Sequence, residues 1–116
     1  MKLKSDDKYF GWIVEEGLID PFSLSELKIK YSNVGLERGR DKRAPIYHVY
    51  GVTMKGSEVE KLTKLLHHKY HYAKFFHGDE VIMVFPNQIC IVNYKTKQGL
   101  KEAKEYAKKL QIVKTI

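Results

Sequence analysis

The chain has 116 residues, of which 43% are hydrophobic and 30% are charged, and its formal net charge is +7. This length and composition predict one globular domain over residues 1–116 with a hydrophobic core of its own. The single cysteine, Cys90, excludes an internal disulfide and therefore a disulfide-stapled scaffold.

The first residues, MKLKSDDKYFGW, carry charges where a secretory signal needs an apolar stretch. The longest apolar runs are VIMVF (81–85) and ICIV (89–92), far below the ~20 residues of a membrane-spanning helix. We therefore expect a soluble, cytoplasmic protein with no membrane partner.

The first half of the chain predicts three strands. KYFGWIV (8–14), ELKIKYSNVGL (26–36) and APIYHVYGVTM (44–54) are rich in aromatic and β-branched residues, which favour strands. The second and third of these could pair across the polar loop 37–44. Between the first two, GLIDPFSL (17–24) predicts a turn or a short helical piece around Pro21.

Two amphipathic helices are predicted. The first begins at Ser57, where Ser57 and Glu60 have the spacing of a capping box, and it ends near residue 69. The second covers residues 98–110. Their apolar stripes are Val59, Leu62, Leu65, Leu66 and Tyr70, and Leu100, Ala103, Tyr106, Ala107 and Leu110.

Three strands, 71–76, 80–85 and 88–94, follow the first helix and are joined by turns at 77–79 and 86–87. The order from residue 46 is therefore β-α-β-β-β-α, preceded by one or two N-terminal strands. This order predicts an α+β fold with a mainly antiparallel sheet. We expect both helices on one face, as in a ferredoxin-like two-layer sandwich.

The strand VIMVF is apolar on both sides, whereas a strand with one solvated face alternates apolar and polar residues. Both faces of the sheet centre should therefore be covered. If the helices cover one face, residues 1–45 or a second copy of the chain must cover the other. The second alternative predicts a homodimer formed through the sheet.

The histidines do not predict a metal site. His67 and His71 have helical i, i+4 spacing only if the helix continues through 71, and an extended segment 71–77 would separate His71 from His77 by about 20 Å. His77, Asp79 and Glu80 could serve acid–base catalysis, but HGDE is also typical of a tight turn. We therefore expect neither catalytic residues nor a cofactor, and an enzyme acting through residues 77–80 remains an alternative.

Two basic segments could bind an anion. The first contains Arg38, Arg40, Lys42 and Arg43, and the second contains Lys97, Lys101, Lys104 and Lys108 along the last helix. Both could equally be solvated surface. Several aromatic residues of the expected sheet could form a stacking platform like that of RNA-binding βαββ domains, namely Tyr47, Tyr50, Tyr72, Phe75 and Phe76. The segment KFFHGDEV lacks the basic-Gly-aromatic motif of such domains.

The sequence thus favours a small non-catalytic binding or regulatory module that self-associates through its sheet. A protein that binds nucleic acid or another polyanion through the two basic segments is the alternative.

Overall fold

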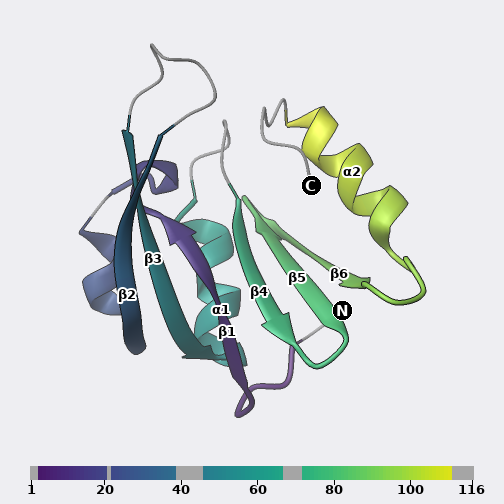
Figure 1. The fold of residues 1–116 in the computed structure, drawn as a ribbon, viewed down its shortest axis with the longest axis horizontal. Helices are drawn as coiled ribbons and strands as arrows, with labels where there is room; N and C mark the ends of the chain where they lie inside the picture. The colour runs from purple at the N-terminus through teal and green to yellow at the C-terminus, as the bar shows by residue number, and fades with distance from the viewer. Residues whose placement is uncertain (1–2, 21, 39–45, 67–71, 111–116) are drawn as a thin grey trace.

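In the computed structural model, residues 3–20, 22–38, 46–66 and 72–110 are described (Figure 1). They form one six-stranded antiparallel sheet in the order β2-β3-β1-β4-β5-β6. The strands are β1 (Lys8–Val14), β2 (Ile29–Arg38), β3 (Ile46–Lys55), β4 (Ala73–His77), β5 (Glu80–Phe85) and β6 (Gln88–Asn93). The helices are α1 (Gly56–Lys61) and α2 (Leu100–Lys109), with 3₁₀ turns η1 (Glu15–Gly17), η2 (Ser23–Glu26) and η3 (Leu62–Lys64).

The prediction of an α+β fold with an antiparallel sheet and two helices is confirmed, as are the β-α-β-β-β-α order and the pairing of β2 with β3. The turn at Pro86–Asn87 also forms, with Asn87 in the left-handed region at φ 63°. None of the described helices is long and apolar enough to cross a membrane.

The two helices lie on opposite faces of the sheet, so the prediction that they share one face is wrong (Figure 1). Val59 of α1 and Leu62 of η3 pack with Ile82 and Val84 of β5. Ala103 and Ala107 of α2 pack with Met83 and Phe85, which point the other way from the same strand. We call these sides the α1 face and the α2 face. The doubly apolar VIMVF is therefore buried by one helix on each side, and a ferredoxin-like arrangement is not confirmed.

Residues 1–45, one of the two alternatives for covering the sheet, contribute both a strand of the sheet and part of the core on the α1 face. β1 is a central strand that pairs with β3 on one side and with β4 on the other. The residues after β1 contribute Leu18 and Leu24 to the core on the α1 face. That core also contains Tyr9, Ile13, Val52, Met54 and Phe75. The α1 face is consequently covered along its length, whereas among the described residues those of α2 cover the opposite face, at β5 and β6.

The first helix is shorter than predicted, and its capping box does not form. The residue before α1 is Lys55, no side chain caps the helix, and the segment continues as the 3₁₀ turn η3. Glu58 points inward instead: its carboxylate accepts hydrogen bonds from the Lys28 N–H at 3.2 Å and the Lys61 ammonium at 2.9 Å. The second helix agrees with its prediction, with Ala103 and Ala107 buried and Leu100, Tyr106 and Leu110 packed beside them.

Candidate functional site

The α2 face presents side chains in two rows that cross the sheet. The first row, from β2 to β6, contains Lys30, Thr53, Phe10, Phe76, Val81 and Val92. The second, from β3 to β6, contains Gly51, Trp12, Lys74, Met83 and Cys90. Helix α2 buries the β5 and β6 end of both rows. Because neighbouring strands lie about 4.8 Å apart, side chains in the remainder of the two rows are neighbours. Among the described residues, Lys30, Phe10, Trp12 and Phe76 are exposed there, and we call this part of the α2 face the open surface.

Three aromatic rings stand together on this open surface, and we call them the aromatic patch: Phe10, Trp12 and Phe76. They are 41%, 38% and 39% exposed. Phe10 and Phe76 are directly opposite each other on β1 and β4. The rings of Phe10 and Trp12 are 5.8 Å apart in an edge-to-face arrangement. Trp12 faces Gly51 on β3, so no β3 side chain stands against it.

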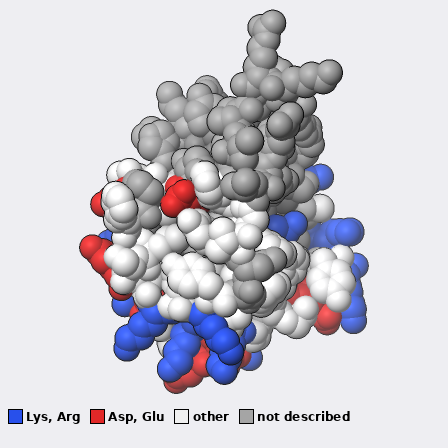
Figure 2. All heavy atoms as spheres, turned by 60° about the vertical axis from the view of Figure 1, so that its left-hand side comes forward, with Lys and Arg blue, Asp and Glu red and all other residues white. Residues whose placement is uncertain are grey.

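Lysines surround the aromatic patch. The Lys74 ammonium lies 5.6 Å from the centre of the Phe76 ring, and Lys30 ends the row that contains both phenylalanines. Lys8 and Lys55 are paired directly across β1 and β3 on the same face, a juxtaposition of like charges that costs stability. Figure 2 shows Lys and Arg side chains, with Asp and Glu side chains among them, beside an uncharged surface.

Acidic side chains are missing from most of this face. Among its described strand positions, those on β1, β3, β4, β5 and β6 carry no carboxylate. Lys8, Lys55 and Lys74 therefore have no carboxylate beside them on these strands. Such a surface has a positive potential that attracts anions.

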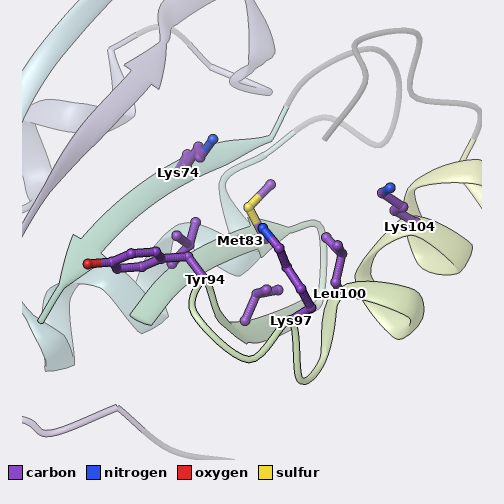
Figure 3. A pocket seen from close by; sticks show the side chains of 8 residues that line it. Lys74, Met83, Tyr94, Lys97, Leu100 and Lys104 are labelled. Carbon is purple, nitrogen blue, oxygen red and sulfur yellow. The ribbon is translucent and has the colours of Figure 1, made fainter. Parts of the chain in front are cut away.

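A groove of about 230 Å³ lies where the open surface meets α2, and we call it the lysine groove. Lys74 of β4, Lys97 of the loop after β6 and Lys104 of α2 line it, together with the ring of Tyr94. Its apolar side is made by Val81, Met83, Val92 and Leu100. Figure 3 shows Lys97 reaching across the groove toward Met83, with Lys104 facing it from α2.

The loop 94–99 places Lys97 by specific local contacts. The Asn93 side-chain oxygen accepts hydrogen bonds from the backbone N–H groups of Lys95 and Thr96, each at 3.0 Å. Lys97 then takes a left-handed conformation at φ 65°, and Gly99 does so at φ 86° just before α2 begins. A Cβ on Gly99 would lie 2.3 Å from the Ile91 carbonyl oxygen, so only glycine fits there.

Two of the predicted anion-binding residues line the lysine groove, and the others either lie elsewhere or are not described. Arg38 ends β2, and Arg40, Lys42 and Arg43 lie outside the described residues. Lys97 and Lys104 line the lysine groove, and Lys97 precedes α2 rather than belonging to it. Lys101 and Lys108 are exposed on α2 and do not line the groove.

The predicted turn cluster at 77–80 is only partly brought together. His77 Nε2 lies 3.0 Å from Asp7 Oδ2, and His77 Nδ1 lies 3.6 Å from Glu80 Oε1. Asp79 instead pairs with the Lys95 ammonium at 3.4 Å. Each nitrogen of the imidazole thus faces a carboxylate, an arrangement that ties the segment before β1 to the β4–β5 hairpin.

The described residues give no support for a metal-binding site or for a nucleophilic cysteine. No group of three or more His, Cys, Asp or Glu side chains there could hold a metal ion. His67, His68 and His71 lie outside the described residues. Cys90 is buried under α2, and burial raises the pKa of its thiol, with the neighbouring Glu102 carboxylate adding to that effect. A thiol in this state is a poor nucleophile.

The aromatic residues expected to form a platform differ from those of the aromatic patch. Among those whose side chains are described, Phe76 belongs to the patch, whereas Phe75 and Tyr50 point to the α1 face and Tyr72 packs against the core under α2. Phe10 and Trp12 were missed. The alternation of KYFGWIV could have identified them, since Tyr9, Gly11 and Ile13 are buried and the residues between them are exposed.

Comparison with protein-family models, with curated proteins and with solved structures finds no match.

Proposed function

We propose that this protein is a non-catalytic module that binds single-stranded nucleic acid on the open part of its α2 face. The observation that carries the proposal is the aromatic patch with lysines of the same sheet face around it. Exposed rings on a sheet are the usual stacking partners of unpaired bases, and lysines bind the phosphates between them.

The patch has the chemistry for stacking without base-specific hydrogen bonds. Its surface consists of ring faces and edges from Phe10, Trp12 and Phe76, with the Lys74 ammonium above Phe76. Every base has a π-face, so a platform of this type binds strands of varied sequence. A duplex keeps its bases stacked on each other and cannot use such rings in the same way.

Self-association through the same face is the competing use of the exposed rings, and it is the alternative that the doubly apolar strands suggested. Two copies placed face to face would bring the lysines of both together, above all Lys8, Lys30, Lys55 and Lys74. A polyanion is complementary to this charge and a second copy is not. Charge therefore favours the nucleic acid as the occupant.

The test is a titration of fluorescently labelled ten-nucleotide oligo(dT) and oligo(U), followed by anisotropy. We expect binding that weakens about fifty-fold between 50 and 200 mM salt, as when about four lysines neutralise phosphates of a single strand. Trp12→Ala and Phe76→Ala should each weaken binding by about five- to one-hundred-fold, the range for the loss of one stacked base.

Matched control variants test whether binding depends on the α2 face and not on other parts of the surface. Phe22→Ala removes a ring that is 81% exposed but lies outside this face and should leave affinity unchanged. Lys64→Gln, on η3, should have little effect, whereas Lys74→Gln should weaken binding and reduce the salt slope by about 0.7 unit.

Three outcomes would overturn the proposal. The first is an absence of binding at 50 mM salt, and the second is equal affinity for single strands and duplexes. The third is a dimer in sedimentation at micromolar concentration that Trp12→Ala converts to a monomer, which would make the patch a self-association interface.

A further inference from the structure

The lysine groove differs in chemistry from the aromatic patch beside it. Three lysines from three separate elements, Lys74 on β4, Lys97 on a loop and Lys104 on α2, line one hollow. None of the described residues that line it is acidic. Three lysines and no carboxylate along one hollow give it a positive potential, so a group with more than one negative charge suits it.

The size of the groove limits what it can hold. At about 230 Å³ it is smaller than the ~300–1,000 Å³ of typical small-molecule sites, so it suits one nucleotide rather than a length of strand. Its apolar side, made by residues such as Val81, Met83 and Leu100, suits the sugar and base of that nucleotide. The ring of Tyr94, which is 48% exposed, lines the same hollow.

The positive charge of the lysine groove determines which kind of phosphate group it binds more tightly. A phosphodiester within a strand carries one negative charge, whereas a terminal phosphomonoester carries between one and a half and two at neutral pH. Three lysines around one hollow therefore favour the monoester over the diester. The groove is also continuous with the aromatic patch, because Lys74 lines the groove and lies over Phe76.

We propose that the lysine groove binds the terminal phosphomonoester of a strand whose following bases stack on the aromatic patch. The inference rests on the proposed function and adds that the protein recognises phosphorylated strand ends. The nucleotide that carries this phosphate would lie over Met83 and Leu100 while Lys97 and Lys104 contact the phosphate.

The experiment compares three forms of the same ten-nucleotide oligo(dT), with a 5′-phosphate, with a 3′-phosphate, and with hydroxyl groups at both ends. Each competes with the labelled strand at 100 mM salt. We expect one phosphorylated form to bind at least about tenfold more tightly than the hydroxyl form, as for one added charge-assisted contact. The arm that gains affinity identifies which end enters the groove.

Variants assign the preference to the groove. Lys97→Gln and Lys104→Gln should abolish most of the difference between phosphorylated and hydroxyl strands while the hydroxyl strand still binds. Lys101→Gln is the matched control, because Lys101 is an exposed lysine on the same helix that does not line the groove. It should retain the full preference.

The failure of this inference is distinguishable from failure of the proposed function. Equal affinity of all three strands, with Trp12 still required, would overturn the inference and leave the proposed function intact. If thymidine 5′-monophosphate bound in a Lys104-dependent manner but no hydroxyl strand bound at all, strand binding would be refuted and the groove would remain a phosphomonoester site. A preference that survives both Lys97→Gln and Lys104→Gln would overturn the assignment to the groove.

Discussion

Gly11 sets how closely β1 approaches β4 in the middle of the sheet. A Cβ at this position would lie 2.1 Å from the Lys74 carbonyl oxygen and 2.7 Å from the Phe75 Cα. These are backbone atoms, which cannot move without disturbing the β1–β4 pairing. We therefore predict that Gly11→Ala lowers the free energy of unfolding by about 3 kcal/mol or more, the upper part of the range for overpacked cores. Urea denaturation followed by circular dichroism measures it.

Gly35 provides the control for this prediction. It also lies in a strand, β2, but a Cβ there has no atom within 4 Å. Gly35→Ala should leave stability unchanged or raise it by about 0.4–1 kcal/mol by restricting the unfolded chain. If both variants behaved alike, the close approach at Gly11 would not limit stability.

Glu58 makes stability depend on pH. The hydrogen bond from the Lys61 ammonium, followed by the one from the Lys28 N–H, lowers the pKa of this carboxyl below its ordinary value of 4.5. Because the folded pKa is the lower one, the stabilisation is complete above pH 4.5 and is lost as pH falls through the folded pKa. We predict that the protein becomes less stable from about pH 4.5 downward.

The variant Glu58→Gln isolates this contribution. It should be less stable than the parent by about 1 kcal/mol at pH 7, since a neutral acceptor forms weaker hydrogen bonds, and the difference should shrink as the solution is acidified. Glu105→Gln, an exposed residue of α2, should retain the parental pH dependence. Thermal unfolding between pH 3 and pH 7 tests both variants. A constant difference across that range would contradict the assignment.

Single residues also show where sequence reasoning succeeded and failed. The burial of Val59, Leu62, Ala103 and Ala107 follows from helical periodicity and is confirmed. The burial of Glu58 was not predicted, because one of its two partners, the Lys28 N–H, lies 30 residues away in the sequence. Local patterns carry no information about such a distant N–H.

At the scale of elements, α2 lies over a small separate core at the edge of the sheet. Ala103 and Ala107 contact the layer that contains Met83, Phe85 and Cys90, and the Tyr106 hydroxyl donates to the Pro86 carbonyl oxygen at 3.1 Å. The burial of Cys90 therefore depends on this helix remaining in place. The rate at which its thiol reacts therefore indicates whether α2 is packed against the sheet.

We predict that alkylation of Cys90 by iodoacetamide is slow in the native protein and becomes about ten- to one-hundred-fold faster in Ala103→Leu. The larger side chain should weaken the docking of α2 by about 1–3 kcal/mol, and each 1.4 kcal/mol raises the open population tenfold. Glu105→Leu, on the exposed side of the same helix, should leave the rate unchanged. Equal rates in both variants would show that α2 does not protect the thiol.

The elements themselves were largely predictable, and their placement was not. β1 and β5 have the expected bounds, because alternation in KYFGWIV and the apolar run VIMVF are strong local patterns. The side of the sheet that each helix covers depends on long-range packing, which no local pattern records. The same holds for the candidate site, where Lys97 and Lys104 were identified but not their meeting with Lys74 in one groove.

At the scale of the whole molecule, the sheet contains two groups of strands, and within each group the pairing is between strands that are consecutive in the sequence. β2 and β3 form a hairpin-like pair, and β4, β5 and β6 form a meander of neighbours in sequence. Only β1 pairs with both groups. The strands that are apolar on both sides predicted that both faces of the sheet are buried. They gave no indication that β1 lies in the middle of the strand order.

The central position of β1 has a consequence for the order of folding. Its partners lie about forty residues downstream in β3 and more than sixty in β4, so these ladders close large loops, whereas every other pairing joins consecutive strands. During synthesis, β1 carries three aromatic rings and can pair with β3 first, but its other edge has no partner until β4 has left the ribosome. One hydrogen-bonding edge of this aromatic strand is thus exposed to aggregation during that interval.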